Sequence, residues 1–104
     1  MAAGDYPFLK VRIASTCQGN VRIYFPTGQQ NVFAEARRLN FDPKACPTCA
    51  EPPFNDITIN MASHPEWVPG ALITRLRLDV CTGGRAGTDD DRVLMDYVRP
   101  AARQ

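Results

Sequence analysis

The chain has 104 residues, of which 44% are apolar and 22% are charged, so its composition is that of a folded globular domain and excludes a disordered segment. Twelve Lys and Arg residues face eleven Asp and Glu residues. The resulting net charge of +1 excludes a global electrostatic attraction to nucleic acid or to an anionic membrane. This length predicts a single domain over residues 1–104, with residues 1–5 and 101–104 as flexible ends.

The start of the chain and its apolar runs indicate where the protein works. The first residues lack a basic segment followed by an apolar core, which predicts that there is no signal peptide. No apolar run approaches the ~20 residues of a membrane-spanning helix. We therefore expect an intracellular protein, cytoplasmic or nuclear, and no membrane partner. In a reducing compartment, four cysteines favour metal or redox chemistry over disulfides.

Two segments near the start alternate apolar and polar side chains. Residues 8–16 and residues 21–25 both follow the period of a half-buried strand. Turn-forming residues separate the two segments, and Pro26 follows the second. The pattern predicts a β-hairpin.

Residues 28–39 predict a helix. A capping-box pattern precedes them, and Val32, Ala36 and Leu39 recur at helical spacing. Arg37 would lie in the last turn, where a cation interacts favourably with the helix dipole.

The middle of the chain is rich in proline. Residues 40–55 hold four prolines and two cysteines, which predicts a loop long enough that something must organise it. Residues 57–61 alternate as a third strand, and residues 62–71 predict a connection in which Trp67 fills the core. Residues 74–81 alternate again and predict a fourth strand.

The last apolar segment, residues 92–98, allows two interpretations. Three acids at positions 89–91 suit a helix N-terminus, and the apolar residues that follow form one helical stripe that ends near Pro100. We expect a helix there. A fifth strand is the alternative, because a short apolar run is ambiguous by its period alone.

The predicted order ββα, loop, ββ, α indicates an α+β fold. It would consist of a four- or five-stranded, mainly antiparallel sheet with helices on one face. A β-grasp arrangement and a ferredoxin-like arrangement both satisfy this order.

The cysteines are the clearest candidates for a chemical site. Cys46 and Cys49 form a CxxC motif, in which both sulfurs can point at one centre. Cys17 follows the first strand and Cys81 ends the fourth, so the predicted topology brings all four cysteines to one edge of the sheet. Four thiolates bind zinc in a closed tetrahedral site. The sequence therefore predicts a structural zinc ion that fixes the proline-rich loop.

Three other interpretations of the cysteines are open. They could be ordinary thiols, with Cys17 and Cys81 as small core residues. The CxxC motif could be a redox pair, or the cysteines could form structural disulfides. An iron–sulfur cluster could use the same thiolates, although their spacing matches neither common ferredoxin pattern. His64 would lie at the opposite end of the sheet, which disfavours it as a zinc ligand.

The outward side chains of the predicted sheet form a basic face. Cations neutralise phosphates and an exposed aromatic ring stacks on a base, so this face predicts contact with RNA or single-stranded DNA, or with a larger protein assembly. A solvated face without a partner is the alternative. The candidate binding residues are Phe8, Lys10, Arg12, Arg22, Tyr24, Arg75 and Arg77.

Catalysis has little support in the sequence. No Walker loop, GxGxxG or HExxH motif occurs, and no local motif ties a nucleophile to a base. No small-molecule substrate is evident. We expect a zinc-stabilised, non-catalytic binding module. The alternatives are a CxxC thiol–disulfide redox protein and a purely structural subunit without metal.

Overall fold

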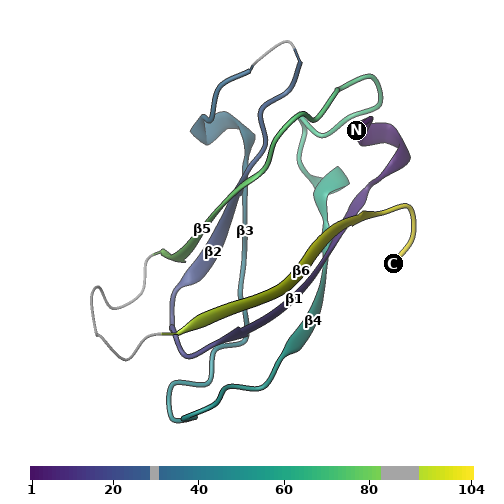
Figure 1. The fold of residues 1–104 in the computed structure, drawn as a ribbon. Helices are drawn as coiled ribbons and strands as arrows, with labels where there is room; N and C mark the ends of the chain where they lie inside the picture. The colour runs from purple at the N-terminus through teal and green to yellow at the C-terminus, as the bar shows by residue number, and fades with distance from the viewer. Residues whose placement is uncertain (29–30, 83–91) are drawn as a thin grey trace.

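The computed structural model of the chain describes residues 1–28, 31–82 and 92–104. In these residues, six strands form two three-stranded antiparallel sheets (Figure 1). The helical segments of the described residues are three short 3-10 helices, η1 (Ala3–Asp5), η2 (Glu35–Arg37) and η3 (Met61–Ser63). The predicted α+β fold with helices on one face is therefore wrong, and the chain is mostly β.

The first sheet has the strand order β4–β1–β6. Its central strand is β1 (Phe8–Ser15), which pairs along its length with β6 (Val93–Ala101) and from Phe8 to Ile13 with β4 (Asn55–Asn60). The alternation predicted for β1 is confirmed, because Leu9, Val11 and Ile13 are fully buried. The strand predicted over residues 57–61 corresponds to β4, which begins two residues earlier and ends one residue earlier, because Met61 opens η3.

The second sheet has the strand order β3–β2–β5. Its central strand is β2 (Asn20–Tyr24), flanked by β3 (Arg38–Phe41) and β5 (Arg77–Thr82). The strand predicted over residues 74–81 corresponds to β5, which begins three residues later and extends one residue further.

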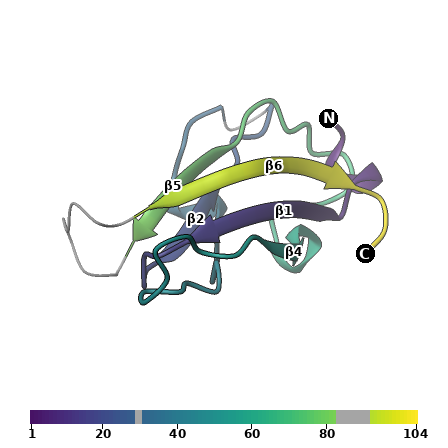
Figure 2. The same ribbon diagram turned by 60° about the horizontal axis from the view of Figure 1, so that its bottom comes forward.

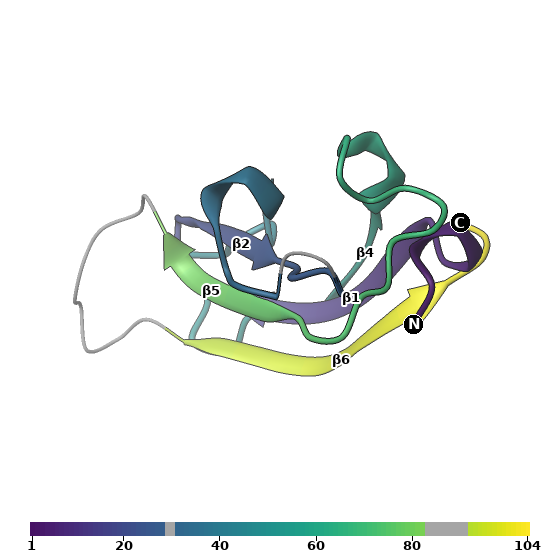
Figure 3. The same ribbon diagram turned by 90° about the horizontal axis from the view of Figure 1, so that it is seen from above.

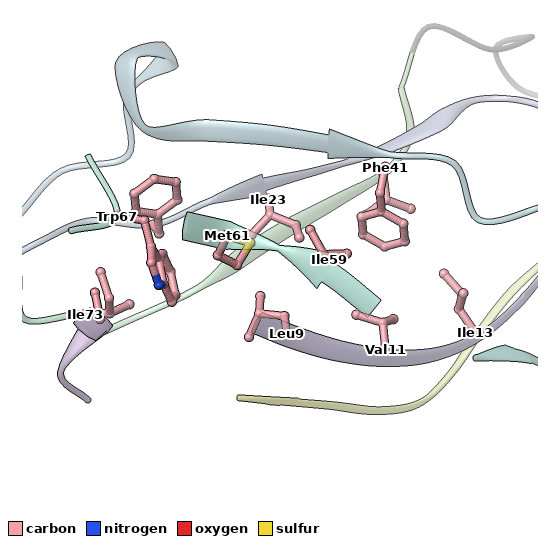
Figure 4. Packing of buried hydrophobic residues seen from close by; sticks show 12 residues of the cluster. Leu9, Val11, Ile13, Ile23, Phe41, Ile59, Met61, Trp67 and Ile73 are labelled. Carbon is pink, nitrogen blue, oxygen red and sulfur yellow. The ribbon is translucent and has the colours of Figure 1, made fainter. Parts of the chain in front are cut away.

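The two sheets pack their inner faces on one shared core. The cluster of buried apolar side chains takes residues from both sheets, and Figure 4 shows Leu9 and Val11 of β1 facing the side chains of Ile23 and Phe41. Trp67, from the connection between β4 and β5, is buried at one end of this core, as predicted, and its indole N–H donates to the carbonyl of Tyr6 at 3.0 Å. The architecture is a β-sandwich.

The predicted hairpin of the first two strands is wrong. β1 and β2 do not pair, because residues 16–19 carry the chain from one sheet to the other. Their alternation is the same in either arrangement, since each strand buries one face. The chain termini lie at the end of the sandwich opposite this connection (Figures 1 and 3).

The helix predicted over residues 28–39 is also wrong. Its described part holds the single turn η2 and the start of β3, in which Leu39 pairs with Ile23. Val32, which the helical stripe required in the core, is 60% exposed. A helical pattern of only three apolar residues is a weak signal, and pairing with β2, which packs Leu39 against the core, overrides it.

The helix predicted over residues 92–98 is the third correction, and the alternative of a fifth strand is right. β6 runs through Pro100 because it is an edge strand, bonded only to β1 (Figure 2). A proline is tolerated there, where a backbone N–H has no ladder partner to serve. The three acids at 89–91, interpreted as a helix cap, lie outside the described residues.

Candidate functional site

The four cysteines form two disulfides, Cys17–Cys81 and Cys46–Cys49, so the zinc prediction is wrong. The Cα atoms are 5.6 Å apart in the first pair and 5.5 Å apart in the second, a separation typical of disulfides. Sulfurs joined in this way have no thiolate to offer a metal. Among the described residues, no group of three or more His, Cys, Asp or Glu side chains could hold a metal ion.

Both disulfides lie at the same end of the sandwich. The backbone N–H of Cys46 donates to the carbonyl of Ser15 at 2.8 Å, two residues before Cys17. Cys17 is buried, and its sulfur accepts the N–H of Gly19 at 3.4 Å. Cys81 lies at an irregularity of the β2–β5 ladder, with a φ of 60°. The four cysteines thus lie at one end of the sandwich, as the predicted topology has them, and they are paired as disulfides in place of a zinc site.

The candidate basic face is divided between two sheets. Phe8, Lys10 and Arg12 alternate with the buried residues of β1, so they point outward from the β4–β1–β6 sheet. The remaining candidates belong to the second sheet: Arg22 and Tyr24 to β2, Arg77 to β5, and Arg75 to the segment before β5. The predicted set therefore does not act as one surface.

On the second sheet, Arg77 and Tyr24 contact one another and their own neighbours. The guanidinium of Arg77 binds the carboxylate of Asp79 through Nε at 3.1 Å, and it stacks on the rings of Tyr24 and Phe33 at 4.4 Å and 4.8 Å. Tyr24 is only 4% exposed, and its hydroxyl donates to Glu35 at 3.0 Å. A ring that is buried and covered by a cation is not available to stack on a base.

Arg75 is likewise occupied. Its guanidinium lies 4.7 Å from the ring centre of Phe33 and donates to the backbone carbonyl of Asn31 at 3.1 Å. Three of the four candidates on this side of the molecule, Tyr24, Arg75 and Arg77, therefore serve internal contacts.

On the first sheet, Arg12 is neutralised by two acids. It pairs with Asp56 of β4 at 3.0 Å and with Asp96 of β6 at 3.2 Å. Asp96 is the extra residue at the bulge of the β1–β6 ladder, and the hydroxyl of Tyr97 donates to Asp56 at 3.1 Å. Three ion-paired groups and one hydrogen bond thus form a closed network at this part of the sheet.

Lys10 has a different environment. It lies directly opposite Arg99 of β6 and Thr58 of β4 in the ladder, next to Phe8 on the same face. Within the described part of the chain, neither Lys10 nor Arg99 has an acidic side chain within ion-pair distance. Arg99 stacks on Tyr97 at 4.8 Å. Sequence reasoning missed Arg99, because it assigned this segment to a helix.

His64 lies at the opposite end of the sandwich from the cysteines. Its ring meets the ring of Phe25 edge-on at 4.8 Å, and its Nδ1 accepts the backbone N–H of Glu66 at 3.0 Å. Burial lowers the pKa of His64 below its ordinary value; the charge of Glu66 opposes this shift and that of Arg37 adds to it. The pKa of His64 is therefore sensitive to the charges of Glu66 and Arg37.

Comparisons with protein-family models, curated proteins and solved structures find no match for this chain. No helix within the described residues is long and apolar enough to cross a membrane.

Proposed function

We propose that this chain is a non-catalytic, disulfide-bonded binding module that contacts an acidic segment of a protein partner through the outer face of the β4–β1–β6 sheet. The observation that supports it is the pair of cations Lys10 and Arg99, which lie directly opposite one another on neighbouring strands and form no ion pair with any acid among the described residues. Like charges in that position destabilise a sheet. A carboxylate from a partner would relieve their repulsion.

A protein segment fits this surface better than a nucleic acid does. Binding of a single strand depends on a row of cations that follows successive phosphates, and on free aromatic faces. Here the cationic patch consists of Lys10 and Arg99, and the next outward-facing position along β1 carries Arg12, already neutralised by Asp56 and Asp96. A nucleic acid strand crossing this face would bring its phosphates against those two acids.

A redox role has less support. In thioredoxin-like proteins the CxxC motif opens a helix, whose N-terminus stabilises the reactive thiolate. Cys46–Cys49 lies instead in a turn, where the N–H of Cys49 donates to the carbonyl of Cys46 at 3.1 Å. That turn offers no helix N-terminus to lower a thiol pKa.

The disulfides bear on location as well. Disulfides persist in oxidising compartments and are rare in the cytosol. We therefore propose that the chain works in an oxidising compartment and not in the reducing cytoplasm or nucleus that the sequence favoured.

The proposal is tested by the binding of a fluorescently labelled, glutamate-rich peptide, measured by anisotropy at low salt. The Lys10→Gln/Arg99→Gln double variant should bind about 2- to 30-fold more weakly, since each exposed ion pair is worth roughly 0.2–1 kcal/mol. The control is Lys44→Gln/Arg103→Gln, which removes the same charge from two exposed positions elsewhere.

Three results would contradict the proposal. The control variant could lose as much affinity, which would show that only net charge matters. The parent protein could fail to bind the peptide, which would favour a purely structural subunit. A single-stranded RNA oligonucleotide could bind more tightly than the peptide through the same two cations, which would favour nucleic acid as the partner of this face.

A further inference from the structure

We propose that a cavity at the end of the sandwich opposite the disulfides binds a small oxyanion, the carboxylate or phosphate group of a ligand, with Arg37 as the residue that holds it. This inference goes beyond the proposed function, because it concerns another surface and another class of ligand. Arg37 is buried beside this cavity, and Glu66 is the acid that lines it among the described residues.

The cavity has a volume of about 660 Å³, within the range of roughly 300–1,000 Å³ found for small-molecule sites. Two chain segments form it, the one that follows β2 and the one that joins η3 to β5. Its lining residues are Thr27, Gly28, Arg37, Glu66, Val68, Pro69, Gly70, Ala71 and Leu72.

Backbone hydrogen bonds hold the two segments in place. The N–H of Gly28 donates to the carbonyl of Leu72 at 2.8 Å, and the N–H of Ala71 donates to that of Val68 at 3.0 Å. The carbonyl of Ala71 in turn accepts the N–H of Ala3 at 2.9 Å. The cavity is therefore formed before any ligand arrives, which lowers the entropic cost of binding.

Arg37 lines this cavity as a buried cation. It is the last residue of η2, where its N–H donates to Ala34 at 3.0 Å and its carbonyl accepts the N–H of Phe25 at 3.1 Å, so its backbone is fixed on both sides. The residue is only 6% exposed. Its guanidinium donates from Nη2 to the carbonyl of Val32 at 3.1 Å, whereas its Nε is buried and has no hydrogen-bond partner among the residues that the structure describes.

The backbone carbonyl of Val32 is a neutral acceptor, so its hydrogen bond does not neutralise the positive charge of Arg37. In the described residues, no carboxylate lies within ion-pair distance of this guanidinium. A buried charge without a counter-ion is costly, and proteins ordinarily pair it. A guanidinium also presents five donors in a planar fork that matches the oxygens of a carboxylate or phosphate. An oxyanion in the cavity would supply the missing charge.

Arg22 provides a comparison. Its Nε is also buried without a partner. Arg22, however, lies opposite Asp79 in the β2–β5 ladder and does not line the cavity. The combination of a buried cation, an unpartnered donor and a cavity therefore occurs at Arg37 and not at Arg22.

Glu66 is the other charged residue that lines the cavity. It is exposed, so it stands at the rim while Arg37 lies inside. Its charge repels an incoming anion and weakens binding. Removal of Arg37 and removal of Glu66 should therefore change the affinity in opposite directions, which a nonspecific surface effect would not do.

The test is a titration of the full chain with inorganic phosphate and, separately, with acetate, followed through the backbone amide and Arg37 Nε–H signals in NMR spectra. We expect saturable shifts at Arg37 and at Gly28, with dissociation constants in the millimolar range. The tighter of the two probes identifies the ligand chemistry. Glu66→Gln should bind several-fold more tightly, and Arg37→Gln should lose saturable binding.

Two further variants keep the test decisive. Arg38→Gln is the matched control, because this neighbouring arginine pairs with Glu35 and does not line the cavity; it should bind like the parent. Should Arg37→Gln not fold, Val68→Trp fills the cavity from an exposed position and should abolish binding. The proposal is overturned if neither probe saturates, if Glu66→Gln weakens binding, or if the folded Arg37→Gln or Val68→Trp variant binds like the parent.

Discussion

The two disulfides should differ in their contribution to stability, because they close loops of different length. Cys17 and Cys81 are separated by 64 residues, whereas Cys46 and Cys49 are separated by 3. The entropy that a crosslink removes from the unfolded chain grows with the logarithm of that separation. It corresponds to about 4 kcal/mol for the long loop and about 2 kcal/mol for the short one. A domain of this size is stable by roughly 5–15 kcal/mol in total.

The measurement is urea unfolding of two double variants, Cys17→Ala/Cys81→Ala and Cys46→Ala/Cys49→Ala, each compared with the parent under non-reducing conditions. We expect the first variant to lose about 4 kcal/mol and the second about 2 kcal/mol. The m-value should rise more in the first, because the freed unfolded chain expands and exposes more surface. Alanine avoids placing a hydroxyl at the buried Cys17.

Equal losses in the two variants would refute this reasoning, since the difference comes only from loop length. A loss below about 1 kcal/mol for Cys17→Ala/Cys81→Ala would refute it too, because loop-closure entropy alone predicts a loss of about 4 kcal/mol for this disulfide. Reduction of the parent with dithiothreitol offers an independent check. The reduced parent should match a quadruple alanine variant within the error of the extrapolation.

Two further predictions concern the core and the pH dependence. Leu9→Ala, at a fully buried position, should lower the free energy of unfolding by about 2–5 kcal/mol in urea titration, whereas Leu94→Ala, at a position 52% exposed, should cost less than about 0.5 kcal/mol. Because burial lowers the pKa of His64 in the folded state, the unfolded state binds the extra proton, so stability should fall as pH drops below about 6.5. His64→Asn should flatten that slope while its side-chain oxygen keeps the bond to Glu66 N–H; an unchanged slope would contradict the assignment.

Local alternation predicted four of the strands. Leu9, Val11 and Ile13 repeat with period two and are all buried, and the same period located β2, β4 and β5. Alternation depends only on one face being buried. It therefore identifies a strand whatever the partner of that strand is.

The partners of the strands were not predictable in the same way. A chain segment of four residues between two strands can turn back within one sheet or cross to a second sheet, and residues 16–19 do the latter. Both arrangements bury the same side chains. The helix predicted over residues 28–39 is wrong for a related reason. Three apolar residues at helical spacing are equally compatible with an irregular segment followed by the short strand β3.

The wrong strand partners affected the predicted cysteine site less than the predicted role of Arg37. The predicted topology brought the cysteines to one end by letting a helix over residues 28–39 return the chain; in the structure the strand β3 returns it instead, and the cysteines still lie at one end. Their pairing depends on Cα separations that no spacing in the sequence reveals. Arg37 was interpreted as a helix-end cation, and its burial beside a cavity depends on residues 66–72, which are distant in sequence.

The division of the cations between two sheets limits how any partner can bind. Lys10 and Arg22 project from opposite outer faces of the sandwich, so one flat surface cannot contact both. Arg99 joins Lys10 only because β6 is a strand and its register places the two residues opposite one another. A helix over the same residues would have carried Arg99 elsewhere and left Lys10 as a lone surface cation. The like-charge pair, and with it the proposed contact to an acidic segment, is therefore a product of the β6 register and would disappear if that strand shifted by one residue.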